Sequence, residues 1–242
     1  MKKIITCLLM LSMMFMFSAT AFASDFSGNA ESELSNISDK IVTAVNDVYS
    51  DKNISITAED INYDSAFKIY VDTNVFKLST NVAGEIENAL ENGNYIYLLP
   101  IDTVNGTVVV NFQRGLPLSE NAKAILSEEE QQEVLDNAGK WVISSLALYK
   151  NGNSNYDYEK KLSSIIDEIP ADTILVGGLP IFQDVVALIP NSDGVIEEIV
   201  PVTATDYDEN LVTYARSNSV IYDYCLLYTS TSPRDKRQSR MP

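Results

Sequence analysis

The apolar positions of the chain divide it into helical and strand-like stretches. Over residues 31–49, apolar side chains recur at the spacing of one helix face. These side chains are Leu34, Ile37, Ile41, Val45 and Val48. Residues 82–91 repeat the pattern over a shorter length, and Gly93 stands where a glycine commonly ends a helix. We expect both segments to be amphipathic helices that cover a sheet.

Other stretches have the composition and alternation of strands. Residues 66–73 alternate between apolar and polar faces. Residues 95–101 and 107–113 are rich in β-branched and aromatic side chains, and Asn105-Gly106 between them is a strong hairpin signal. A second hairpin is predicted for residues 181–189 and 195–202, which are joined through Asp193-Gly194. Further short strands are expected at residues 53–57, 173–176, 211–216 and 219–224.

The strongest helix signal is the capping box formed by Ser127 and Glu130. Apolar residues at helical spacing follow it, so we expect one helix over residues 127–149. Trp141, the only tryptophan, falls in the apolar stripe of this helix, which favours core packing over a ligand platform. A short helix is expected at residues 156–166, and the polar residues 151–155 are a weak candidate for a domain boundary. Together these elements predict an α+β fold in which antiparallel hairpins are covered by amphipathic helices.

The first 23 residues have the three parts of a secretory signal peptide. Lys2 and Lys3 give a positive start, residues 4–17 are apolar, and Ala21-Phe22-Ala23 form a cleavage site before Ser24. The apolar run is shorter than the roughly 20 residues that a membrane-spanning helix needs. We expect a bacterial precursor whose mature protein, residues 24–224, is secreted or lies at the cell surface, with no membrane contact after cleavage.

The composition of the chain changes at Cys225. Four basic residues and one acidic residue occur in the tail CLLYTSTSPRDKRQSRMP. Residues 225–230 resemble a translated sequencing adapter, in which TGT CTC TTA TAC ACA TCT encodes Cys-Leu-Leu-Tyr-Thr-Ser. Residues 232–235 and 239–242 match later adapter codons, and Thr231 departs by a single base. We therefore expect residues 225–242 to be non-native and the natural chain to be cut near Tyr224.

Charge and missing residue types restrict the function of residues 24–224. Without the two signal lysines and the five charged residues of the tail, 11 basic and 33 acidic side chains remain, a net charge of −22 against −17 for the printed chain. This balance disfavours nucleic acid and anionic membrane surfaces as partners. The segment contains neither cysteine nor histidine. It therefore cannot itself supply a Ser-His-Asp or Cys-His pair, a Cys/His zinc site, iron–sulfur ligands or the commonest haem ligands.

Three acidic groups are candidates for chemistry, and each has a plainer structural explanation. The groups are Asn191, Asp193, Glu197 and Glu198; Glu128, Glu129 and Glu130; and Asp206, Asp208 and Glu209. The first resembles half of a calcium loop, but a hairpin turn explains it better. The second offers an acid–base pair, but negative charge in a first helical turn complements the helix dipole. The third offers cation ligands, with solvated surface as the default.

No catalytic residue, cofactor or metal ligand is assigned from the sequence. Gly177-Gly178 does not open a helix, so it lacks the context of a phosphate-binding loop. We expect an exported, acidic, non-enzymatic binding or interaction module whose ligand is an unknown protein or carbohydrate. The alternative is an exported carboxylate-dependent hydrolase, with calcium as an optional aid.

Overall fold

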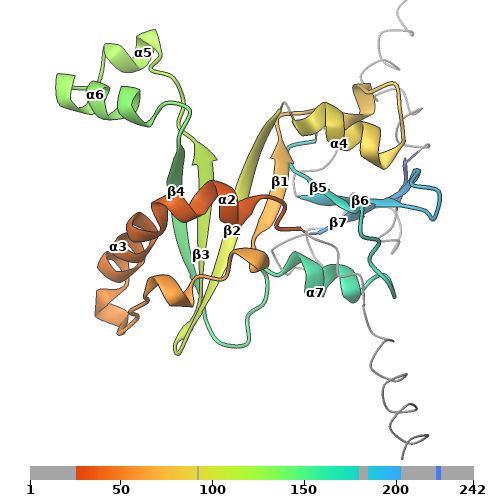
Figure 1. Ribbon diagram of the computed structural model, residues 1–242, viewed down its shortest axis with the longest axis horizontal. Helices are drawn as coiled ribbons and strands as arrows, with labels where there is room; N and C mark the ends of the chain where they lie inside the picture. Colours follow the sequence, from red (N-terminus) through yellow and green to blue (C-terminus); the bar gives the residue numbers. More distant parts are fainter. Residues whose placement is uncertain (1–25, 92, 180–184, 203–221, 225–242) are drawn as a thin grey trace, which may run out of the picture.

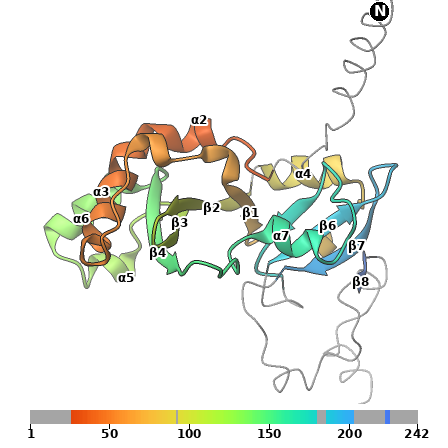
Figure 2. The ribbon, with the colours of Figure 1, turned by 90° about the horizontal axis from the view of Figure 1, so that it is seen from below.

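The protein is built around one mixed β-sheet. The computed structural model describes residues 26–91, 93–179, 185–202 and 222–224. Within these residues the sheet has eight strands in the order β4-β3-β2-β1-β5-β6-β7-β8, of which Figure 1 labels the first seven and Figure 2 labels β8. The strands are β1 (Phe67–Val71), β2 (Asn94–Thr103), β3 (Gly106–Arg114), β4 (Trp141–Tyr149), β5 (Ile174–Val176), β6 (Val186–Pro190), β7 (Ile196–Pro201) and β8 (Tyr222–Asp223). Neighbouring strands are antiparallel except β1 and β5, which run parallel.

Short helices connect and cover these strands. The α-helices are α2 (Ala30–Leu34), α3 (Ser38–Val48), α4 (Ala83–Glu91), α5 (Glu120–Lys123), α6 (Glu128–Asn137) and α7 (Tyr158–Ser163). The 3-10 turns are η1 (Ser35–Ile37), η2 (Ser50–Lys52), η3 (Ala58–Asp60), η4 (Tyr63–Ser65) and η5 (Val75–Lys77). The α+β class is therefore confirmed. The narrower description as antiparallel hairpins is incomplete, because the parallel β1–β5 pair joins two antiparallel halves.

Three apolar clusters place the helices on the sheet. Helices α2 and α3 pack on β2, β3 and β4, while α4 packs on β1, β5, β6 and β7. Figure 2 shows these three helices on the same side of the sheet. Helix α7 packs against the opposite face, through Tyr158 and Leu162. The alternation of side chains along β1 explains this division. Tyr70 packs on the face that α4 covers, whereas Phe67 and Ile69 pack on the face that α7 covers.

Both predicted hairpins occur, although residues 181–184 of the second one lie outside the described residues. In the β2–β3 hairpin the last pair is Thr103 with Gly106, and a Cβ added to Gly106 would lie 2.2 Å from the carbonyl oxygen of Tyr149. In the β6–β7 hairpin, Gly194 has a φ of +74°, and the side chain of Asn191 accepts hydrogen bonds from the backbone of Asp193 and Val195. Each turn therefore depends on a glycine that other residues replace only with strain.

The predicted helix over residues 127–149 is wrong in its second half. The helix α6 ends at Asn137, and residues 141–149 form the strand β4. Ser144 is an extra residue in β4, because Asn111 pairs with Ser145 whereas Phe112 pairs with Ile143. This bulge puts Trp141, Ile143, Leu146 and Leu148 on one face, packed in one cluster. The helical prediction relied on Trp141, Val142, Leu146 and Tyr149, whose spacing also fits a helix face, and the bulge removes the strict alternation that would have indicated a strand.

The remaining predictions have mixed outcomes. The helix expected at residues 31–49 is divided into α2, η1 and α3, and residues 53–57 are not a strand, although Ile54 and Ile56 are buried. The strand expected at residues 211–216 lies outside the described residues, as do residues 1–25 and 225–242. In the part of the chain that the structure describes, no helix has the length and apolar character to cross a membrane.

Candidate interaction site

A helical arm leaves the sheet between β3 and β4. We define the arm as residues 115–140, which contain α5 and α6 and project beyond the ends of the strands (Figure 1). No residue of α5 or α6 is buried. Of the six large hydrophobic side chains that are exposed among the described residues, three belong to the arm: Leu116 (73% exposed), Ile125 (83%) and Leu135 (52%). The arm therefore presents apolar surface to solvent.

Local hydrogen bonds give the arm its shape. The hydroxyl of Ser119 accepts a hydrogen bond from the backbone of Ala122 and caps α5. The capping box predicted for Ser127 and Glu130 is present at the start of α6, where Glu130 accepts from the backbone and hydroxyl of Ser127. These hydrogen bonds hold the pKa of the Glu130 carboxyl below its usual value. The side chain of Gln131 then donates to the carbonyl groups of Lys123 and Leu126, which joins the two helices.

The base of the arm is closed by backbone contacts. Gly115 donates a hydrogen bond to the carbonyl of Lys140 at 2.8 Å, and Gly139 donates to the carbonyl of Gly115 at 2.8 Å. A Cβ added to Gly115 would lie 2.1 Å from the backbone oxygen of Asn137. Only glycine fits at position 115, because the two sides of the base approach too closely for a side chain.

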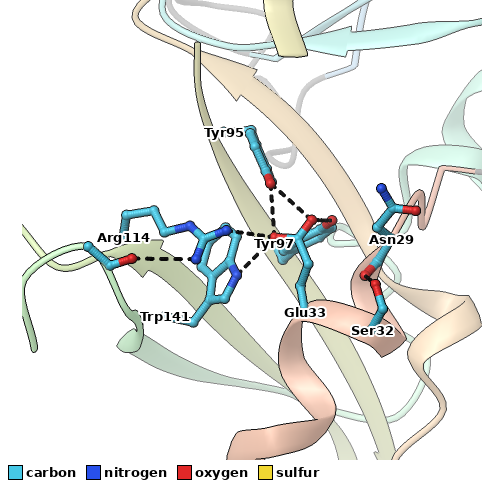
Figure 3. A network of polar contacts seen from close by, with 8 residues as sticks. Asn29, Ser32, Glu33, Tyr95, Tyr97, Arg114 and Trp141 are labelled. Carbon is cyan, nitrogen blue, oxygen red and sulfur yellow. Dashed lines mark hydrogen bonds and ion pairs between the residues drawn. The ribbon is translucent and has the colours of Figure 1, made fainter. Parts of the chain in front are cut away.

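A glutamate on α2 joins the base of the arm to the sheet (Figure 3). The side chain of Glu33 is 17% exposed. Its carboxylate accepts hydrogen bonds from Trp141 Nε1 at 2.9 Å and from an Arg114 guanidinium nitrogen at 2.8 Å. It also accepts from the hydroxyl of Tyr95 at 2.9 Å and from that of Tyr97 at 3.2 Å. Arg114 ends β3 and Trp141 begins β4, so this cluster, which we call the Glu33 network, holds both strands where the arm starts.

Aromatic rings surround the Glu33 carboxylate, and burial keeps the tyrosine hydroxyls that donate to it protonated. The guanidinium carbon of Arg114 lies 4.0 Å from the centroid of the Trp141 ring, and the rings of Tyr97 and Trp141 lie 5.2 Å apart. Burial raises the pKa of Tyr97 well above its usual value, and the charge of Glu33 raises it further. Burial also raises the pKa of Tyr95, as does its hydrogen bond to Glu33. Both phenols therefore stay protonated and donate to the carboxylate at neutral pH.

The structure separates the candidates that the sequence suggested. Trp141 is 5% exposed and lies in the core, as predicted, but it sits on a strand and its ring nitrogen binds Glu33. Asn191 donates to Glu197 at 2.7 Å and organises the β6–β7 turn, which confirms the hairpin interpretation of that group. Glu128, Glu129 and Glu130 lie in the first turn of α6, as predicted. The group at residues 206–209 lies outside the described residues.

The sequence did not reveal an acidic cavity that lies between β2, the turns η3 and η4, and the start of α7. Its volume is about 300 Å³, and its walls include Asp60, Asp64, Asp102, Asp157, Glu159 and the aromatic residues Phe26, Phe67 and Tyr156. Three of the carboxylates have structural partners: Asp60 accepts from Thr57, Asp102 accepts from Thr107, and Asp157 caps α7. Among the described residues, no group of three or more acidic, cysteine or histidine side chains is arranged to hold a metal ion.

No family model, curated protein or solved structure matches the chain.

Proposed function

We propose that the protein is an exported, acidic, non-enzymatic interaction module that binds a partner protein through the arm. One observation carries this proposal: Leu116, Ile125 and Leu135 are exposed on a projecting element that contributes no buried residue from its helices. Large apolar side chains that are exposed on a protrusion are available to a partner, and a contiguous exposed apolar patch marks a site of protein contact.

Burial of these exposed apolar side chains by a partner would contribute to the free energy of binding. Full burial of a leucine or isoleucine side chain contributes about 1.5–3 kcal/mol. Ile125 makes almost none of this contribution to folding, because 83% of its surface stays in water. The same surface, if covered by a partner, would stabilise the complex by that order.

The fixed position of the base of the arm favours binding as well. A partner that orders a mobile element loses part of its binding energy to conformational entropy. The backbone bonds at Gly115 and the contact of Glu33 with both flanking strands already hold the base of the arm. The arm has no aromatic side chain on which a sugar could stack, so a protein partner is favoured over a carbohydrate.

Site-directed photo-crosslinking tests the proposal. The photoreactive residue p-benzoylphenylalanine is placed at Ile125 and, as the matched control, at Val104 in the β2–β3 turn. Both side chains are β-branched and 83% exposed, but only Ile125 lies on the arm. In cells that export the protein, we expect a discrete adduct with another protein from position 125 and none from position 104. Equal adducts from both positions, or none from either, would contradict the proposal.

The acidic cavity favours one second candidate function, an exported hydrolase that works through carboxylates, with or without calcium. Five carboxylates and three aromatic rings line one hollow, which is a setting for acid–base chemistry. The pKa of Asp60 is held below its usual value by hydrogen bonds from Thr57, so Asp60 is a poor proton donor at neutral pH. Hydrolysis of a panel of polysaccharides and peptides is measured with and without calcium. Activity that is lost in Asp64→Asn and kept in the turn variant Asp193→Asn would support this candidate, and an inactive wild type would remove it.

A further inference from the structure

The outer edge of β4 is unpaired in the part of the chain that the structure describes. The strand order places β4 at one end of the sheet, with β3 as its only neighbour there. Natural proteins commonly protect such an edge with charged residues or proline. Residues 141–149, WVISSLALY, contain neither. The one irregularity is the bulge at Ser144, which leaves residues 145–149 as a regular stretch with a free row of backbone groups.

The strand at this edge and its neighbour β3 carry no acidic residue of their own. Residues 103–119 and 137–156, which include all of β3 and β4, contain no aspartate or glutamate, although residues 24–224 contain 33. Their only charged side chains are Arg114, Lys140 and Lys150. Two molecules of net charge −22 repel each other over most of their surface. A strand that carries no acid of its own offers an approach with less of this repulsion.

The regular stretch is complementary to itself. Leu146 and Leu148 are half-buried and pack toward the helical side of the sheet, whereas Ser145, Ala147 and Tyr149 occupy the other face. An antiparallel pairing centred on Ala147 sets Leu146 opposite Leu148 of a second copy, and Ser145 opposite its Tyr149. Lys150 then falls opposite Ser144 rather than another lysine, so no like charges face each other directly.

We infer that the edge of β4 pairs with β4 of a second copy, antiparallel about Ala147, to form a symmetric dimer. Isologous pairing of this kind closes on itself and removes the free edge. The paired stretch is short, and stable interfaces bury roughly 1,600 Å² in total. We therefore expect a dimer of modest affinity, with a Kd on the order of tens of micromolar. This inference does not depend on the partner proposed for the arm.

Sedimentation of the exported chain tests the dimer, in reducing buffer so that Cys225 cannot link two copies. The informative variants are Ala147→Lys and Ala147→Glu, because position 147 lies opposite itself across the symmetry axis. Each should weaken dimerisation roughly tenfold or more by placing like charges together. An equimolar mixture of the two should recover a heterodimer, since lysine then faces glutamate. Gln113→Lys, an exposed change on β3, is the matched control and should dimerise like the wild type.

The fluorescence of Trp141 and the melting temperature check that each variant is folded. A wild type that stays monomeric up to about 300 µM, well above the expected Kd, would overturn the inference. Dimers that persist in both position-147 variants, or a mixture that stays monomeric when each variant is folded, would overturn it as well.

Discussion

Replacement of Glu33 by alanine should destabilise the protein far more than replacement of any exposed acid. The Glu33 carboxylate accepts hydrogen bonds from four side chains, and two of the donors, Tyr97 (0% exposed) and Trp141 (5%), are buried. With the acceptor gone, each buried donor loses its partner while it remains shielded from water.

The magnitude follows from counting the donors. A buried donor without a partner costs about 1–3 kcal/mol. The pair with Arg114 adds little, because its side chain is 44% exposed and such pairs contribute about 0–1 kcal/mol. Tyr95 is half-buried and contributes an intermediate amount. We expect Glu33→Ala to lower the free energy of unfolding by roughly 3–5 kcal/mol, the range for breaking a buried charged network from one side.

Urea unfolding measures this loss, and the protein supplies its own probe. Trp141 is the only tryptophan and binds Glu33 directly, so its fluorescence reports on the network, while circular dichroism reports on the whole fold. Glu31→Ala is the matched control, since Glu31 lies on the same helix and is exposed. It should change stability by less than about 0.5 kcal/mol. If Glu33→Ala were no more damaging than Glu31→Ala, the network would not hold the base of the arm.

Three further predictions follow from other contacts. The hydroxyl of Tyr70 is buried with no hydrogen-bond partner among the described residues, so Tyr70→Phe should be neutral or stabilising by about 1 kcal/mol at pH 7. Burial, then the charges of nearby glutamates, raises the pKa of Tyr70 to about 12 from 10.0. Below pH 10 this phenol is protonated in both the folded and the unfolded state. As the pH rises from 10 to about 12 the unfolded state ionises first, so the stability of the wild type falls, and Tyr70→Phe should flatten that loss. Gly115→Ala should lower the melting temperature, because its Cβ overlaps the backbone of Asn137, at a cost of about 1–3 kcal/mol. Ile125→Ser should change the free energy of unfolding, measured in urea, by less than about 0.5 kcal/mol, because Ile125 is exposed.

Local signals in the sequence predicted the local structure well. The Asn105-Gly106 and Asp193-Gly194 turns and the Ser127–Glu130 capping box all occur where their residues indicate. Each depends on a few neighbouring residues, so no distant contact is needed to specify it. The sheet order is different, because the parallel pairing of Tyr70 with Val176 joins residues far apart in the chain that carry no pairwise signal.

The bulge and the Glu33 network show why the remainder escaped prediction. At Ser144 a single extra residue shifts the alternation of β4, and only the register against β3 reveals it. Glu33 looks like any solvated helix acid, since its donors Tyr95, Arg114 and Trp141 lie 62 to 108 residues further along the chain. Folding alone brings an α-helix and three strands around one carboxylate. The residues of such a site have no characteristic spacing in the sequence, so the sequence alone does not predict it.

The two inferred contact surfaces differ in chemistry, and their positions make them compatible. The arm contains acidic residues such as Glu120 and Glu133 as well as its exposed apolar side chains, whereas the strand β4 contains no acidic residue. The arm begins at the Trp141 end of β4, outside the stretch 145–149 that pairs across the dimer axis. Antiparallel pairing would therefore set the bases of the two arms at opposite ends of the joined strands. A dimer of this form would offer two arms to a partner that is itself multivalent, and the second contact would gain from the effective concentration that the first creates.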